Sequence, residues 1–243
     1  MNRREQGFGL IELMVSMLIG LIVVLGVTQI FIAAKNTYLA QNASAAMQED
    51  ARYALSKMVQ EIRMTGMFGC LATVTPDATA ADFAAAYLLP ISYVTTTVGT
   101  VTSSTLTLIT ADVSSVNSGS STAPNWTVVT DCYSTATAYA GSKTVAGMLS
   151  FPVRKSLYTY QNNQLMTVSG GTSSVLINNV SAFSLLFGVA SSSTSTSVSA
   201  YTATPTSPSL IRSVRISLTL TDPNARVKSQ QFVVVAAMRN RLQ

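Results

Sequence analysis

The sequence contains no histidine and little charge. Its 243 residues include no His, two Cys and only 10% charged residues, whereas a soluble domain of this size usually carries about 25%. Without histidine, the chain cannot build a Ser-His-Asp or Cys-His nucleophile, a His-ligated zinc site or an imidazole acid/base. Two thiols cannot build a four-thiolate metal site either. Catalysis would therefore depend on Lys or on the ten acidic residues.

The acidic residues are too dispersed to predict a catalytic group. Asp77, Asp82, Asp112, Asp131 and Asp222 are scattered along the sequence, and most stand beside turn-forming residues. Capping and surface roles explain such positions more simply than catalysis does. We therefore predict no enzymatic activity, no cofactor and no metal site.

Hydrophobic residues are concentrated near the N-terminus. Residues 13–34 carry no formal charge, and a helix of this length can cross a hydrocarbon core of roughly 30 Å. The span is too long for the apolar region of a secretory signal peptide. Arg3 and Arg4 precede it and bias the N-terminus towards the cytoplasm, so the following domain is expected outside the cytoplasm. Placing the carboxylate of Glu12 at the start of a membrane span costs free energy, which indicates a cationic partner in an assembly.

The residues around Glu12 resemble the class III signal of type IV prepilins. The stretch Gln6-Gly7-Phe8-Gly9-Leu10-Ile11-Glu12 follows a short basic leader and precedes the apolar helix. The resemblance implies that a prepilin peptidase cuts between Gly7 and Phe8 and that Phe8 becomes N-methylated. It also implies that Glu12, the fifth residue of the mature chain, pairs with the N-terminal amine of a neighbouring subunit. Desolvating two opposite charges together costs less than desolvating either alone.

The order of elements predicts an α+β fold, one long helix followed by many strands. With the resemblance, this implies the type IV pilin fold, in which the helix packs on an antiparallel β-sheet domain. We expect a leader peptide (1–7), a transmembrane and fibre-core half of the helix (8–34), an amphipathic half (35–66) and a periplasmic β-rich domain (67–243). The amphipathic half is predicted to bury a stripe that recurs at spacings of three and four: Met47, Ala51, Ala54, Leu55, Met58 and Ile62.

Alternating apolar and polar residues predict strands beyond residue 70. The cleanest strand is Val214–Leu220, and a turn at Asp222 is expected to return the chain as an antiparallel partner, Gln231–Ala237. Asn162 and Asn163 can adopt positive φ and favour a hairpin. Further strands are expected at Ser104–Thr110 and Asn125–Thr130. The segment Val175–Val189 fits either two strands or a short helix followed by a strand. Two stretches rich in Ser and Thr, Ser114–Thr122 and Ser191–Ser199, are expected to be solvated loops.

The two cysteines follow elements that a disulfide would connect. Cys70 comes after the long helix, and Cys132 comes after the strand that contains the only Trp. In an oxidising periplasm such a pair favours a disulfide, and closing a loop of about 60 residues contributes roughly 4 kcal/mol in the chain-entropy account. Two free buried thiols are the alternative.

Several segments resemble the PilW family of minor pilins. They include Met47-Gln48-Glu49, Arg52-Tyr53-Ala54, Thr130-Asp131-Cys132 and Val214-Arg215-Ile216. The resemblance implies a minor pilin that primes type IV pilus assembly in a tip complex and helps to display a large adhesin. Its implied partners are other minor pilins, the major pilin, the prepilin peptidase and the inner-membrane assembly platform. The related J-type minor pseudopilins of type II secretion are the alternative.

The resemblance to PilW has two further implications. The protein is expected first in the inner membrane, with a single span and a periplasmic domain, and then in the pilus fibre. Some relatives carry calcium-binding loops, but the loop after Val189 has no carboxylate cluster, so we predict no calcium there.

A DNA-binding role in uptake is a further alternative. The net charge of +5 is modest and does not by itself indicate nucleic-acid binding. Alternation could place several cationic residues near the C-terminus on one solvent-exposed face, although sheets are normally solvated in this way too: Arg212, Arg215, Arg226, Lys228, Arg239 and Arg241.

Overall fold

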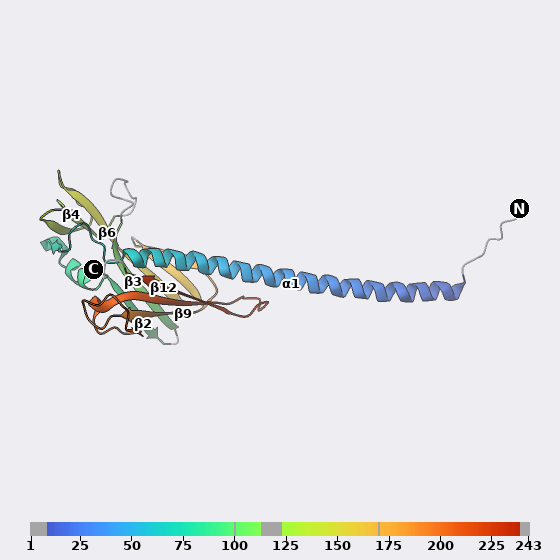
Figure 1. The fold of residues 1–243 in the computed structure, drawn as a ribbon. Helices are drawn as coiled ribbons and strands as arrows, with labels where there is room; N and C mark the ends of the chain where they lie inside the picture. Colours follow the sequence, from blue (N-terminus) through green and yellow to red (C-terminus); the bar gives the residue numbers. More distant parts are fainter. Residues whose placement is uncertain (1–8, 100, 113–122, 170, 239–243) are drawn as a thin grey trace.

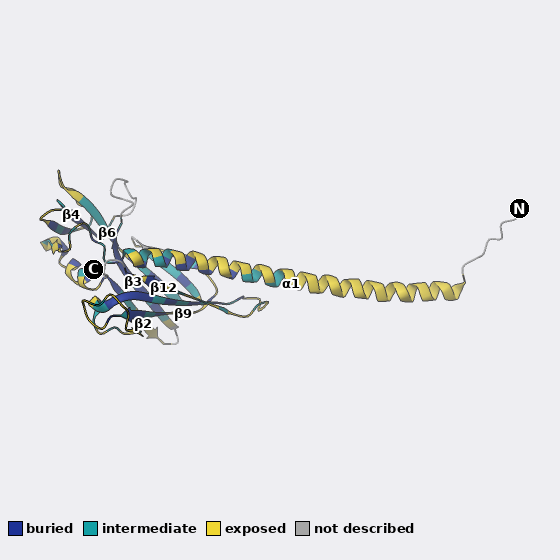
Figure 2. Ribbon diagram, in the orientation of Figure 1, coloured by how far each residue is buried: buried dark blue, intermediate teal, exposed yellow. Residues whose placement is uncertain are grey.

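The protein consists of one long helix that projects from a β-rich domain (Figure 1). The computed structural model describes residues 9–99, 101–112, 123–169 and 171–238. Helix α1 (Leu10–Met64) spans 55 residues, and only its C-terminal part packs on the β domain (Figure 2). The predicted α+β layout of a pilin fold is confirmed. The other helical elements are short: η1 (Ala78–Ala80), α2 (Phe83–Leu88) and η3 (Pro208–Leu210).

The β domain contains two sheets. The larger has eight strands in the main order β1-β5-β4-β6-β3-β2, with β7 paired to β6 and β8 paired to β7. The smaller sheet has the order β10-β9-β11-β12. The larger sheet comprises β1 (Thr75–Pro76), β2 (Ile91–Val98), β3 (Val101–Ala111), β4 (Trp126–Thr130), β5 (Ala136–Ala140), β6 (Leu149–Gln161), β7 (Gln164–Ser169) and β8 (Thr172–Ile177); the smaller comprises β9 (Val180–Val189), β10 (Ala200–Thr202), β11 (Ile211–Leu220) and β12 (Gln230–Ala237).

The amphipathic part of α1 buries the predicted stripe. Its six residues, spaced by three and four along the helix, are the buried residues of α1, as the 3.6-residue period requires. Met58 and Ile62 are completely buried, in one core with Leu106 of β3 and Ile216 of β11. The helix therefore holds both sheets together on its buried side.

The strand predictions near the C-terminus are confirmed. Strands β11 and β12 pair antiparallel along their length, with Ile216 opposite Val234. Asn162 and Asn163 adopt φ values of 50° and 60° in the tight connection between β6 and β7. The ambiguous segment 175–189 proves to be extended, but β8 and β9 join different sheets.

Two tyrosines connect the sheets at the edge of β9. The Tyr93 hydroxyl donates to the Phe183 carbonyl at 3.3 Å, and the Tyr160 hydroxyl donates to the Ser181 carbonyl at 3.1 Å. Both carbonyls belong to β9, whereas the tyrosines come from β2 and β6 of the larger sheet. The two hydroxyl groups thus satisfy backbone carbonyls that would otherwise remain unpaired at the edge of the strand.

Helix α1 ends where the chain enters the β domain. Gly66 has φ +80°, a conformation that favours glycine, and its N–H donates to the Ile109 carbonyl at 3.0 Å. The Thr110 hydroxyl donates to the Met64 carbonyl at 2.8 Å and satisfies one acceptor at the helix end. The helix terminus is therefore bonded directly to β3.

Candidate functional site

The N-terminal part of α1 is apolar and solvent-exposed. Large hydrophobic residues from Leu10 to Ile32 project from it on all sides, and an 18-residue window of α1 reaches a mean hydropathy of 2.7 with none of it buried by the rest of the chain. Among the described residues, this helix alone is long and apolar enough to cross a membrane. Such an exposed apolar surface is unfavourable in water, so this half requires a bilayer or neighbouring helices.

Glu12 lies in the first turn of this apolar half. Its Oε2 accepts the N–H of Gly9 at 3.1 Å, and a negative charge is favourable at a helix N-terminus. Glu12 is the only charged residue between Gly9 and Ala34. A positive charge to balance Glu12 at this position on α1 must therefore come from the chain terminus or from another molecule. The two predicted processing residues, Gly7 and Phe8, lie outside the described part of the chain.

A disulfide fastens the chain at the other end of α1. Cys70 and Cys132 are bonded, with Cα atoms 5.4 Å apart, so the segment after the helix is tied to the end of β4. The following turn is organised by Asp131, whose Oδ1 accepts the N–H groups of Tyr133, Ser134 and Thr135 at 2.9 Å each. These hydrogen bonds to the carboxylate hold the pKa of Asp131 well below its ordinary value.

The other scattered aspartates hold local structure. Asp77 accepts the Thr79 N–H at the start of η1, and Asp82 accepts the indole N–H of Trp126 at 2.9 Å. Asp222 accepts the N–H groups of Asn224 and Arg226 in the connection after β11. Together with Asp131, these residues cap helical turns, orient a core aromatic ring or close turns.

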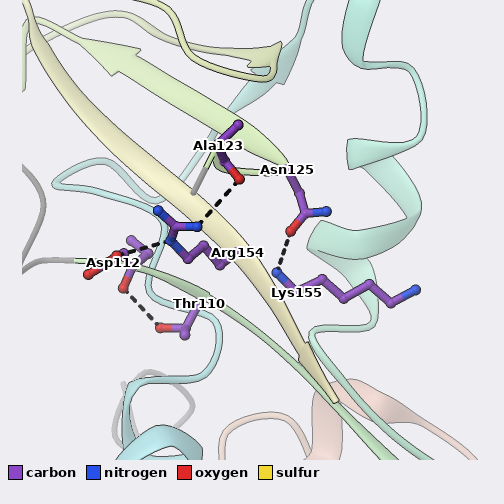
Figure 3. A network of polar contacts seen from close by, with 7 residues as sticks. Thr110, Asp112, Ala123, Asn125, Arg154 and Lys155 are labelled. Carbon is purple, nitrogen blue, oxygen red and sulfur yellow. Dashed lines mark hydrogen bonds and ion pairs between the residues drawn. The ribbon is translucent and has the colours of Figure 1, made fainter. Parts of the chain in front are cut away.

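Asp112 belongs to a polar network around Arg154 (Figure 3). Arg154 is nearly buried; its Nε lies 3.0 Å from Asp112 Oδ2, and its Nη1 donates to the Ala123 carbonyl at 3.4 Å. Nearby, the Lys155 N–H donates to Asn125 Oδ1 at 2.8 Å. The network fixes both ends of the segment that contains the predicted loop Ser114–Thr122, which itself lies outside the described residues.

Among the described cationic residues near the C-terminus, Arg212 does not face solvent. Arg212 is only 4% exposed, and its guanidinium donates to the carbonyls of Ser193, Ser195 and Ser209. It therefore holds the Ser/Thr-rich loop after β9 and does not contribute to a solvent-exposed cationic face. Arg215 stacks on Tyr201, and Arg226 and Lys228 lie beyond the strand. Arg239 and Arg241 lie outside the described residues.

A cavity of about 580 Å³ lies beside the end of α1. It is lined by residues 66–72 together with Tyr87, Leu88, Pro90 and Ser209. No Asp, Glu, Lys or Arg is among these residues, so the cavity offers no carboxylate or amine for acid–base chemistry.

Together these features fit one class of protein: a membrane-anchored assembly subunit, in which the N-terminal half of α1 is left uncovered by the other described residues. Residues 2–28 match the family described as the prokaryotic N-terminal methylation motif. This motif supports a prepilin-like protein, that is a type IV pilin or pseudopilin, with a structural role, and it implies association with other pilins and with the assembly machinery. No curated protein matches the chain with significant similarity.

Proposed function

We propose that this protein is a minor pilin of the PilW kind, which primes type IV pilus assembly within a tip complex and helps to display an adhesin there. The observation that carries the proposal is the methylation motif at residues 2–28, continued by an apolar helix half that the chain leaves exposed. In this role, residues 1–7 are removed as the leader, Phe8 becomes the N-methylated first residue, and the domain 67–243 faces the periplasm.

Glu12 sets the position of the subunit against its neighbour in this proposal. Its Oε2 accepts one N–H bond within its own chain, and a carboxylate has capacity for several donors. The methylated amine of a neighbouring subunit supplies the positive charge that this part of α1 lacks. In a bilayer or a fibre core, the two charges stabilise each other because water is excluded.

The exposed helix half packs against lipid before assembly and against neighbouring helices afterwards. A Cβ added at Gly20 or Gly26 would contact no neighbouring element within 4 Å. Both glycines therefore leave room on the exposed half for another helix to approach closely. The disulfide and the core around Met58 keep the β domain fixed to the same helix. A helix that enters the fibre therefore carries the domain into a defined orientation.

Deletion of the gene in the organism that makes the protein tests this proposal. We expect fewer surface fibres by electron microscopy, an unchanged amount of major pilin in the membrane by immunoblot, and recovery when the wild-type gene is restored. Normal fibre numbers in the deletion strain would contradict the priming role. Normal fibres combined with a loss of protein secretion would instead assign the subunit to a type II secretion pseudopilus.

A further inference from the structure

The outer face of the smaller sheet carries a row of apolar residues around one arginine. Strand register places Leu186 of β9, Arg215 of β11 and Val235 of β12 side by side, and Val233 lies two positions before Val235 on β12. Tyr201 of β10 lies beside this row. We name these five residues the outer sheet face, because the alternate residues of β11 pack into the core beneath α1.

The outer sheet face leaves considerable apolar surface in solvent. Val233 is 54% exposed, Val235 is 47% exposed and Tyr201 is 38% exposed. Leu186 is partly buried beside them. Adjacent exposed apolar side chains with an aromatic residue are typical of protein contact surfaces.

Arg215 is held in a fixed position on this face. Its guanidinium carbon lies 4.7 Å from the centre of the Tyr201 ring. The ring packs closely over Gly188, where an added Cβ would lie only 3.1 Å from Tyr201 Cε1. The Tyr201 hydroxyl also lies 3.4 Å from Ser213 Oγ, so the ring is held at both places. The positive charge is therefore preorganised on the face, at little further entropic cost to a partner.

The described part of the chain provides no carboxylate for Arg215. The two ion pairs among the described residues, Lys57 with Glu61 and Arg154 with Asp112, do not include Arg215. Glu49 and Asp50 lie on α1, the helix that covers the opposite side of the sheet. An exposed neutral face with a single unpaired cation is complementary to a surface that presents one carboxylate among apolar residues.

We propose that the outer sheet face docks a neighbouring pilin-like subunit, which places a carboxylate on Arg215 and apolar side chains on Val233 and Val235. The inference rests on the proposed function, because assembly brings other pilins alongside this domain. Arg and Tyr dominate the energetic centres of protein interfaces, and this face holds one of each in contact. A nucleic acid is a poorer match, since phosphate binding needs several cations and this face has one.

Site-specific photo-crosslinking in cells tests the docking surface. A photoreactive phenylalanine analogue replaces Val233 in the full chain; the control position is Val94 of β2, which is 57% exposed on the other sheet. We expect Val233, and not Val94, to crosslink a second protein that mass spectrometry identifies as pilin-like. Arg215→Glu is expected to lower the crosslink at least tenfold, whereas Arg215→Lys retains part of it.

Other outcomes would overturn the inference. Equal crosslinking from both positions, a crosslink unaffected by Arg215→Glu, or a crosslink only to a second copy of this chain would each exclude the docking surface as stated. Steeply salt-dependent binding of a single-stranded oligonucleotide that Arg215→Glu abolishes would favour nucleic acid instead. If Arg215→Glu unfolds at the same temperature as the wild type, misfolding is excluded as the cause of a lost crosslink. Fibre counts in the deletion strain remain a separate readout, so the priming role can fail or stand independently.

Discussion

Glu12 is the residue on which the assembly account depends most. It is the only charge in the apolar half of α1, and it already accepts the Gly9 N–H. A charge kept in this position at a cost of a few kcal/mol requires a compensating partner. The sequence alone indicated this residue, because a lone carboxylate in an apolar run is visible without any structure.

Substituting Glu12 separates charge pairing from hydrogen bonding. Glu12→Ala removes both, whereas Glu12→Gln keeps an acceptor without the charge. We expect leader cleavage in both variants and at least tenfold less of each variant in sheared fibres, since the neighbour's amine loses its counter-charge. Immunoblots of sheared fibres and of membranes measure this. Incorporation of Glu12→Gln at the wild-type level would refute the charge pairing.

Asp131 gives the domain a predictable acid sensitivity. Hydrogen bonds from the backbone hold its folded-state pKa below the ordinary value of 3.8, so its contribution to stability is present above that pH and is lost as the pH falls further. Asp131→Asn should lower the melting temperature at neutral pH, and the difference from wild type should narrow below pH 3.8. Thermal unfolding across pH measures this; a difference that stays constant would exclude the carboxylate as its origin.

At the residue scale, contacts between distant residues could not be predicted. Arg212 stands two positions before the buried Val214, so alternation places it on the core side, but the partners of its guanidinium, the carbonyls of Ser193, Ser195 and Ser209, do not follow from that pattern. Ser193 and Ser195 belong to the loop after β9, whose position the local sequence does not encode. The roles of Asp77, Asp131 and Asp222 were more accessible, because Asp beside turn residues forms short-range hydrogen bonds.

At the element scale, local patterns identified what local physics determines. The stripe of α1 and the β11–β12 pair follow periods of 3.6 and 2 residues. The division into two sheets did not follow, since β8 and β9 are separated by two residues and pair with different partners. Helix α2 was missed because six residues are too few for a helical period to appear.

The contact between α1 and the sheets should dominate the stability of the domain. Met58 is completely buried in the core shared by both sheets, so Met58→Ala should reduce the free energy of unfolding by about 2–5 kcal/mol through a cavity. Leu25→Ala, in the exposed half of the same helix, is the matched control and should leave it nearly unchanged. Chemical denaturation in detergent measures both; equal effects would show that α1 does not anchor the domain through this stripe.

At the scale of the whole molecule, the unusual composition has two sources. The apolar excess lies in the exposed half of α1, and the scarcity of charge extends through a β domain rich in Ser and Thr. The class of protein could be predicted from the first residues because the processing signal is a contiguous motif. The surfaces of the β domain could not, because they combine strands far apart in the sequence, as Leu186, Arg215 and Val235 do.

The most direct measurement is the N-terminal chemistry of the protein in assembled fibres. Mass spectrometry of sheared, purified fibres should detect this protein as a minor component whose first residue is N-methylated Phe8, with residues 1–7 absent. That result would establish processing and incorporation together. A chain that retains the leader, or a processed chain found in membranes and never in fibres, would contradict the account.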